Sequence, residues 1–265
     1  MGAVIAPGKA ARSWKRALCI LRRPYEYMVF YSGLLLFALP LLTWSLLAVV
    51  LYPVLPRRIS APLGQSVLST LFRTYLFALK ASGLVKIDLG ALDALREERS
   101  LIIAPNHPSL LDAVLVVSRL PRVVCIMKAE IRDRLIFGGA ARLAYYIRND
   151  SALGMVRAAA AAVGAGNQLL VFPEGTRTRQ TPVNPFKGGF ALIAKTAGVP
   201  VQTVFIETNS LFLGKGWPLF RKPTFPLIYR ARLGQRFEVN GDVKTFVSDL
   251  EGYYRQTLVT DNMAA

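Results

Sequence analysis

The sequence of 265 residues is poor in the side chains from which metal and disulfide sites are built. His107 is the only histidine, so a metal site with several histidine ligands is excluded. Cys19 and Cys125 are the only cysteines. Two cysteines provide neither a disulfide framework nor a full set of zinc ligands, which excludes the small disulfide-rich and zinc-ribbon classes.

Acidic residues are also scarce. The chain has 33 Lys and Arg against 16 Asp and Glu, a net charge of +17. Such a charge implies an acidic partner, namely nucleic acid, anionic lipid or an acidic protein. Because 53% of the residues are hydrophobic and no zinc-finger or RNA-binding signature is present, the sequence favours a lipid surface and no nucleic-acid partner is expected.

Charged residues are absent from residues 28–55, which follow a basic segment without acidic residues. This run is long enough to cross a bilayer as a helix, and the competing interpretation is a buried core helix. Basic residues flank both ends, so charge does not fix an orientation. Because Pro40 lies near the middle, we favour two short helices that enter the membrane and return. Residues 63–80 are expected to form an amphipathic helix at the interface.

From about Val85 short apolar runs alternate with helical stretches. Strands are expected at 85–89, 101–105, 123–127, 143–147, 168–172 and 199–206, and helices at 109–119, 151–165 and 187–197. This order predicts an α/β fold with a mixed, largely parallel sheet flanked by helices. We therefore divide the chain into a membrane-associated segment, residues 1–82, and an α/β domain, residues 83–265. Asp242 is expected to cap a last amphipathic helix.

A first polar motif, Asn-His-Pro-Ser-Leu-Leu-Asp at 106–112, follows the predicted strand 101–105. Pro108 suits the first turn of a helix, which would place His107 at the carboxyl end of the strand and Asp112 one turn into the helix. The carboxylate could then orient the imidazole as a base, with backbone N–H groups at 108–110 as oxyanion donors. Ser109 is a competing nucleophile, and a structural role for a lone histidine also stays open.

A second motif, Phe-Pro-Glu-Gly-Thr-Arg at 172–177, also follows a predicted strand. Gly175 permits an unusual turn, and Arg177 offers a forked donor for phosphate. Glu174 could accept a hydroxyl hydrogen bond or pair with an arginine. The competing interpretation is a solvated loop with a structural Glu–Arg pair.

Together the two motifs resemble the NHxxxxD and glycerol-phosphate-binding blocks of the glycerolipid acyltransferase family, and especially bacterial 1-acylglycerol-3-phosphate acyltransferases. Val199-Pro200-Val201 is similar to a further block of that family, and so are Lys128-Ala129-Glu130 and the run at 186–189. The resemblance spans roughly residues 83–240. It implies that residues 83–265 form an acyltransferase domain.

The resemblance also implies roles. His107 is similar to the base that deprotonates the acceptor hydroxyl, and Asp112 to its orienting partner. A further set resembles residues that bind substrate or shape its site, namely Lys128, Glu174, Gly175, Thr176, Arg177 and Pro200. The family uses acyl-CoA or acyl carrier protein as donor, so no cofactor is expected beyond that donor substrate.

One block departs from the family pattern. Many members end the strand near residue 147 with Ile-Asp-Arg, whereas this chain has Ile147-Arg148-Asn149-Asp150. Arg148 is a candidate headgroup contact or a solvated charge closing the strand, and the shift leaves open a different lysolipid acceptor, such as a lyso-aminolipid. The loop 209–226 interleaves aromatic and cationic residues, which suits either the headgroup zone of a bilayer or ordinary packing.

The sequence therefore predicts an acyltransferase of the inner membrane, with its catalytic domain on the cytoplasmic face, where acyl-CoA and acyl carrier protein are found. That location favours the hairpin over a single span. Its expected partners are membrane lipids, the lysolipid acceptor and, for a protein-bound donor, acyl carrier protein. Competing functions are a thioester or ester hydrolase and a non-catalytic module that binds anionic lipid. The sequence does not indicate an oligomeric state.

Overall fold

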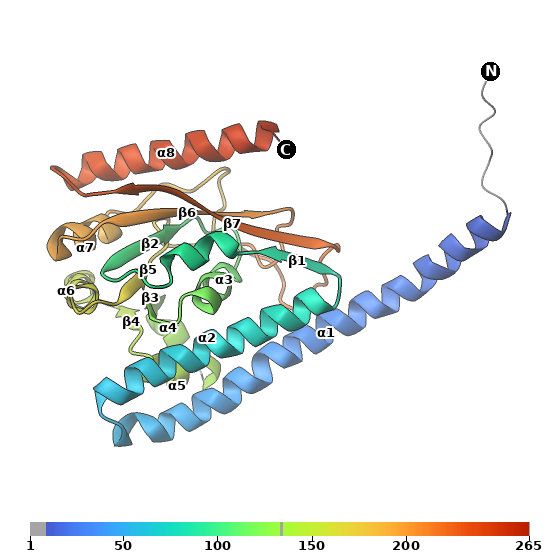
Figure 1. Cartoon of the computed structure of the whole chain (residues 1–265), viewed down its shortest axis with the longest axis horizontal. Helices are drawn as coiled ribbons and strands as arrows, with labels where there is room; N and C mark the ends of the chain where they lie inside the picture. The colour runs from blue at the N-terminus through green and yellow to red at the C-terminus, as the bar shows by residue number, and fades with distance from the viewer. Residues whose placement is uncertain (1–8, 133–134, 265) are drawn as a thin grey trace.

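A computed structural model describes residues 9–132 and 135–264, so residues 1–8 of the predicted basic segment lie outside the described residues. Two helices precede an α/β body (Figure 1). In chain order the elements are α1 Lys9–Val54, α2 Arg57–Ala81, β1 Val85–Asp88, η1 Gly90–Leu95, β2 Leu101–Pro105, α3 Asp112–Arg119, β3 Val123–Lys128, α4 Ala129–Arg132, α5 Leu135–Leu143, β4 Ile147–Asn149, α6 Ala152–Gly164, β5 Gln168–Leu170, α7 Gly189–Ala197, β6 Val201–Thr208, β7 Leu227–Phe237 and α8 Val243–Ala264.

The seven strands form one sheet in the order β1-β7-β6-β2-β5-β3-β4. Strands β6, β2, β5, β3 and β4 are mutually parallel, and among the described strands only the β6–β7 pair is antiparallel. The predicted α/β fold with a mixed, largely parallel sheet is confirmed. The central strand β2 is buried along its whole length, as its uninterrupted apolar sequence predicts.

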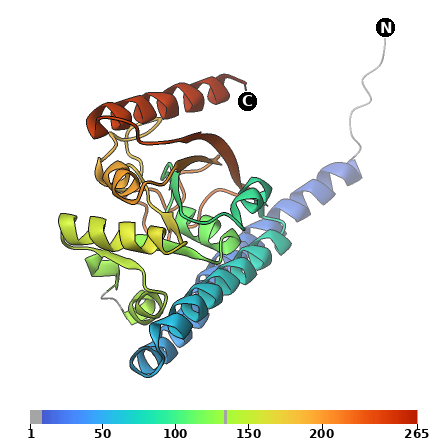
Figure 2. The ribbon, with the colours of Figure 1, turned by 60° about the vertical axis from the view of Figure 1, so that its left-hand side comes forward.

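Helices cover both faces of the sheet. Helices α6, α7 and α8 pack together on one face, whereas α3, η1 and α2 lie on the other (Figures 1 and 2). This division follows from the strand order, because right-handed crossovers in opposite directions along a parallel sheet place their helices on opposite faces. Alanines of α6, such as Ala159 and Ala162, are buried and permit close packing.

The prediction that Pro40 splits residues 28–55 into two short helices is wrong. Helix α1 runs without a break through Pro24, Pro40 and Pro53. Each proline removes one backbone donor, but neighbouring turns that pack on other helices keep the helix intact. The chain turns back only after Val54, and α2 returns alongside α1 (Figures 1 and 2).

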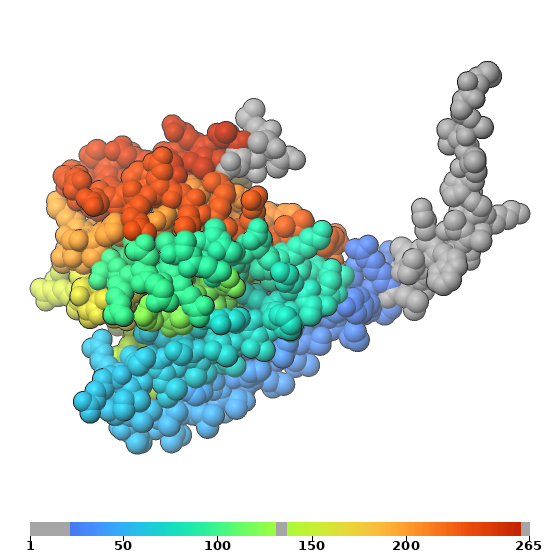
Figure 3. Space-filling model, in the orientation of Figure 1, coloured from blue at the N-terminus to red at the C-terminus, as the bar shows by residue number. Residues whose placement is uncertain are grey.

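Helix α1 presents two apolar faces. One contacts α2 and α5 and contains buried residues such as Phe30, Leu41 and Ala48. The other is exposed at a spacing of three to four residues or its multiple, and comprises Met28, Tyr31, Leu35, Leu39, Leu46, Val50 and Val54. By length and composition Arg22–Val54 could cross a membrane, a criterion that signal sequences and core helices also meet. The two helices form one long side of the molecule (Figure 3).

Helices α1 and α5 approach each other very closely at Gly139. A Cβ added there would lie 1.9 Å from the carbonyl oxygen of Ser45, so only glycine fits. The buried Ser45 hydroxyl accepts hydrogen bonds from the N–H groups of Gly139 and Ala140, at 2.9 and 3.2 Å. This contact joins α1 firmly to the α/β body.

Candidate active site

The two motifs meet at one edge of the sheet because they follow neighbouring parallel strands. Residues 106–112 leave the carboxyl end of β2, and residues 171–179 leave the carboxyl end of β5. Ligands commonly bind at this edge of an open α/β sheet. The hydrogen bond from Thr178 N to His107 O, at 2.7 Å, ties the two segments together.

His107 and Asp112 form the predicted pair. Nδ1 of His107 lies 2.8 Å from Oδ2 of Asp112, and the same oxygen accepts a hydrogen bond from Ser109 N at 2.8 Å. Asp112 is fully buried, whereas 14% of the His107 side chain is exposed. Burial raises the pKa of Asp112, and the hydrogen bonds from His107 and Ser109 oppose that rise.

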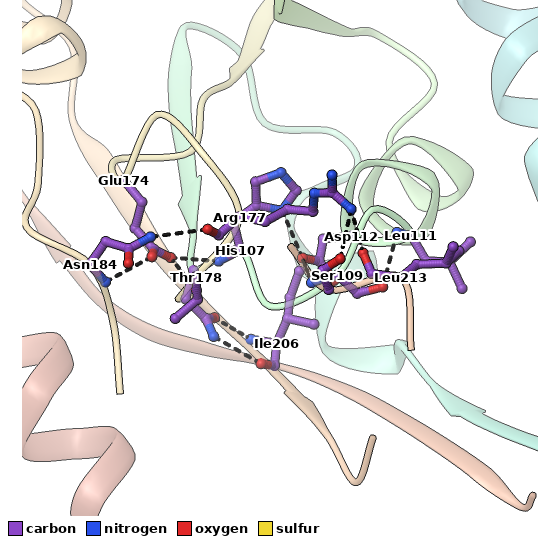
Figure 4. A network of polar contacts seen from close by, with 12 residues as sticks. His107, Ser109, Leu111, Asp112, Glu174, Arg177, Thr178, Asn184, Ile206 and Leu213 are labelled. Atoms are coloured by element: carbon purple, nitrogen blue, oxygen red, sulfur yellow. Dashed lines mark hydrogen bonds and ion pairs between the residues drawn. The ribbon is translucent and has the colours of Figure 1, made fainter. Parts of the chain in front are cut away.

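Phe172 and Asp112 fix the imidazole ring from two directions, and Figure 4 shows the contact with Asp112. Its plane stacks on the ring of Phe172, with the ring centres 3.8 Å apart and 13° between the planes. Asp112 holds Nδ1, and no residue of the described chain bonds to Nε2. An oriented imidazole with one open nitrogen is the arrangement that a general base requires.

The local geometry around 108–112 differs from the prediction. Helix α3 begins at Asp112, not at Pro108, and residues 108–111 form turns. The predicted oxyanion donors are occupied: Ser109 N bonds to Asp112, Leu110 N donates to Leu213 O at 3.0 Å, and Pro108 has no N–H. An N–H that already donates within the protein is not available to an oxyanion, so that prediction is wrong.

Ser109 is not placed as a nucleophile. Its side chain is fully buried, and its hydroxyl donates to Phe212 O at 2.9 Å while it accepts from Leu111 N at 3.2 Å. Both contacts hold the turn that carries Asp112. The serine is therefore a structural part of the motif.

Glu174 holds the backbone of both motifs. Its Oε1 accepts hydrogen bonds from His107 N at 2.9 Å and Thr178 Oγ1 at 2.8 Å, and its Oε2 accepts one from Asn184 N at 2.8 Å. The side chain is buried, with 1% of its surface exposed. This geometry gives no support to the predicted direct contact between Glu174 and an acceptor, because the protein itself uses the carboxylate (Figure 4).

Asn106 begins the first motif, but the sequence assigned it no role. Its side-chain amide donates to Ile206 O at 3.0 Å and accepts from Ile206 N at 2.7 Å. These two bonds continue the β2–β6 pairing beyond the end of the strand and fix the residue directly before His107. The signal available in the sequence was a polar amide directly after an apolar strand, since a buried amide needs hydrogen-bond partners.

Gly175, Thr176 and Arg177 follow Glu174 beyond the carboxyl end of β5. Gly175 has φ +66, which explains the glycine. Arg177 Nη1 donates to Leu213 O and Gly214 O, at 2.8 and 3.0 Å, so this arginine clamps the loop 209–226. Desolvation lowers the pKa of Arg177, and the charge of Asp112 counteracts this.

The three remaining predicted residues, Lys128, Arg148 and Pro200, lie at different distances from the site. Lys128 ends β3 and its charge acts on Lys215 beside Thr176. Arg148 lies on β4, three strands or roughly 14 Å from β2, and its Nε is 3.0 Å from Asp150 Oδ2. Pro200 accepts a hydrogen bond from Ile102 N at the amino end of β2, so it lies at the opposite edge of the sheet from His107.

The loop 209–226 is only partly exposed. Phe212 and Phe225 are buried, so packing accounts for them. Leu211, Leu219 and Phe220 are exposed, and their contact with a membrane stays a prediction. Within the described chain, no three His, Cys, Asp or Glu side chains are grouped so as to hold a metal ion.

Comparisons of the sequence with known proteins find similarity to acyltransferases. A family model described as "Acyltransferase" matches residues 86–207. The chain is 37% identical over 113 residues to a 1-acyl-sn-glycerol-3-phosphate acyltransferase of Cocos nucifera, covering 40% of this chain and 37% of that protein. It is 31% identical over 148 residues to lysophosphatidylcholine acyltransferase 1 of Rattus norvegicus, covering 53% and 26%. The matches thus span less than half the length of these two relatives.

A solved structure shares the fold. The crystal structure of the 1-acyl-sn-glycerophosphate acyltransferase PlsC from Thermotoga maritima superposes with a TM-score of 0.63 at 18% sequence identity. The superposition covers 91% of this chain and 97% of that one. The likeness therefore includes the two N-terminal helices as well as the α/β body.

Proposed function

We propose that this chain, of which residues 86–207 match the acyltransferase family model, transfers a fatty acyl group from a thioester to the free hydroxyl of a lysophospholipid. The single observation that carries the proposal is the His107–Asp112 pair, with Nδ1 held at 2.8 Å and Nε2 open. We take 1-acylglycerol 3-phosphate as the acceptor, because the cationic side chains of Arg177 and Lys215 lie at the same edge of the sheet as this imidazole.

In the proposed reaction, His107 Nε2 removes the proton of the acceptor hydroxyl as its oxygen attacks the thioester carbonyl. The new C–O bond forms, the C–S bond breaks, and the imidazolium returns its proton to the leaving thiolate. Asp112 stabilises the imidazolium and keeps the ring in one tautomer. The acceptor's own hydroxyl is the nucleophile, so the reaction requires no serine.

An apolar cavity beside the site suits the acyl chain. The cleft is narrow and open to the surface, and it lies between α1, α2 and the sheet. Leu111 and Leu115 line it, and they flank Asp112 in sequence. Burying a hydrocarbon chain there is favourable by about 0.8 kcal/mol for each CH₂ group. The apolar lining is therefore our reason for proposing that the acyl chain enters along this cleft.

We further propose that the exposed face of α1 enters a membrane, with acyl-CoA or acyl carrier protein supplied from the cytoplasmic side. The length and apolar composition of α1 support membrane association in general. A cell (inner) membrane location and the cytoplasmic orientation are the specific parts of this proposal. Protease accessibility of a C-terminal tag in spheroplasts and in inverted vesicles tests the orientation.

A panel of lysolipids assayed with acyl-CoA and with acyl carrier protein donors tests the function. We expect acyl transfer to lysophosphatidate, and His107→Ala should lower kcat by at least ~10²-fold, the lower end for loss of a general base. Release of free fatty acid at the same rate without acceptor would identify a hydrolase instead. Transfer that is undiminished in His107→Ala would remove the imidazole from the mechanism and leave a lipid-binding module as the better explanation.

A further inference from the structure

Lys215 occupies an unusual position in the loop 209–226. It is exposed, and its Nζ lies 3.4 Å from Oγ1 of Thr176, within the second motif. Partial desolvation lowers the pKa of Lys215, and repulsion from Lys128, Arg179 and Arg177 lowers it further. The positive charges of Lys215, Lys128, Arg179 and Arg177 therefore lie close enough to repel one another. This repulsion is an electrostatic free-energy cost, which a bound anion would remove.

The backbone around Lys215 is specialised for this placement. Leu213 has φ 56, which is rare for a residue with a branched side chain, and Gly216 has φ +90. A Cβ on Gly214 would lie 2.8 Å from Leu211 O, so glycine is required there as well. Residues 213–216 thus combine two positive-φ residues with one glycine that a close contact requires, more than a loop that merely covers a surface would need.

Hydrogen bonds from both motifs hold the loop in this conformation. Arg177 donates to Leu213 O and Gly214 O, Leu110 N donates to Leu213 O, and Ser109 donates to Phe212 O. The two bonds from Leu110 and Ser109 join the segment directly before Lys215 to the turn that carries Asp112, and the two bonds from Arg177 join it to the second motif. The position of the ammonium group is thus linked to the position of the catalytic pair.

A second lysine of the same loop provides a contrast. Lys222 lies 2.7 Å from Oε2 of Glu26, so the protein supplies its counter-ion. Within residues 9–132 and 135–264, Lys215, Lys128, Arg177 and Arg179 form no ion pair with a carboxylate. The loop therefore pairs the lysine that lies against α1 and leaves uncompensated the one that faces the site.

We propose that Lys215 binds the phosphate of the acceptor and selects a phosphomonoester headgroup over a zwitterionic one. This inference rests on the proposed function. In 1-acylglycerol 3-phosphate the phosphate is only a few bonds from the reacting hydroxyl, so it must lie close to His107, where Lys215 and Arg177 converge. The phosphates of CoA are a whole pantetheine arm away from the thioester, which favours the acceptor as the source of this phosphate.

Steady-state kinetics of Lys215→Ala, with Lys244→Ala as a control, test the inference. Lys244 is an exposed lysine of α8, so its loss makes the same charge change away from the site. We expect Lys215→Ala to raise the KM for lysophosphatidate about 10-fold, the usual effect of losing a charge-assisted hydrogen bond, and to change kcat less than about 3-fold. Lys215→Arg should restore most of the affinity, and the KM for lysophosphatidylcholine should not change.

Two donor arms separate the possible sources of the phosphate. Acyl-CoA and the phosphate-free thioester acyl-N-acetylcysteamine are compared at saturating lysophosphatidate. We expect Lys215→Ala to leave the KM of both donors unchanged. A higher KM for acyl-CoA alone, with the KM for lysophosphatidate unaltered, would assign Lys215 to the donor and overturn the inference.

Direct binding distinguishes failure of this inference from failure of the proposed function. Lysophosphatidate binding in detergent micelles is measured by calorimetry for the chain with and without Lys215→Ala, after circular dichroism has established that both are folded. If no lysolipid is acylated but Lys215→Ala weakens binding about 10-fold, the transferase proposal fails and Lys215 remains a phosphate ligand. Equal binding by both proteins would refute the role of Lys215 whatever the activity.

Discussion

Replacing Glu174 with glutamine separates a structural role of this residue from a role in acceptor binding. The buried carboxylate accepts three hydrogen bonds, from His107 N, Thr178 Oγ1 and Asn184 N. Glutamine has the same shape but only one oxygen. If that oxygen keeps the bonds to His107 and Thr178, the NH₂ group faces the N–H of Asn184, and two donors are opposed.

The structure sets the size of the effect. One charge-assisted bond is lost and one buried donor is left unsatisfied, which together cost about 2–4 kcal/mol of unfolding free energy. For a chain of this size, each kcal/mol lowers Tm by about 2–4 °C, so we expect Tm to fall by roughly 4–16 °C. The KM for the acceptor should stay within about 2-fold of the wild-type value, because no substrate contact is removed.

Thermal unfolding in detergent and acceptor titrations measure these two quantities. Glu251→Gln is the matched control, since Glu251 also accepts a backbone N–H, from Phe186 at 2.8 Å, but is only partly buried and lies in α8. That variant should lose less stability and no activity. An unchanged Tm for Glu174→Gln together with a large rise in acceptor KM would refute the structural role and restore the direct contact predicted from the sequence.

Three further changes test other parts of the structure. Asp112→Asn should lower kcat by about 10²–10⁴-fold in acyl-transfer assays, because the carboxylate fixes the tautomer of His107, and near-normal kcat would contradict that role. Gly139→Ala should lower the free energy of unfolding by about 1–3 kcal/mol in denaturant titrations, because its Cβ would overlap the backbone of Ser45, and an unaltered midpoint would dispute the close helix contact. Gly33→Leu extends a side chain into the apolar cavity, so competition between acyl-CoA species should shift toward shorter chains, whereas unaltered selectivity would place the acyl group elsewhere.

Much of the α/β body could be predicted because its strands are short apolar runs with polar motifs at their ends. The strand at residues 101–105 agrees fully with β2, and helix 151–165 differs from α6 by one residue at each end. The Asp242 cap was also predicted, and its Oδ2 accepts a hydrogen bond from Thr245 N at 2.9 Å. In each of these cases local sequence and final environment favour the same conformation.

Other elements were missed where tertiary packing decides. The run at 143–147 is apolar enough for a strand, but Leu143 ends α5, Tyr145 turns with φ 56, and β4 begins only at Ile147. Strand β7 was not predicted, because its arginines take alternate, less buried positions and the segment therefore has no continuous apolar run. Its pairing with β6 stabilises it through contacts far apart in the chain.

The residues of the candidate site could be predicted, but the hydrogen bonds that join them could not. The spacing of His107 and Asp112 was sufficient to place them together. The three-way use of Glu174 and the clamp from Arg177 to Leu213 join segments separated in the sequence, and no local pattern reports such hydrogen bonds. The position of Lys215 depends on that clamp, which is why the sequence indicated only a basic aromatic loop.

The tight seam between α1 and α5 has a mechanical consequence. An enzyme tethered by a flexible linker samples many heights above a bilayer, and its substrates must travel to it. Here the close contact between Ser45 and Gly139 holds α1 rigidly against the α/β body that carries His107. The depth and tilt of α1 in a bilayer therefore determine the height of the His107 imidazole above that bilayer. We accordingly expect kcat to change with the hydrocarbon thickness of the lipids.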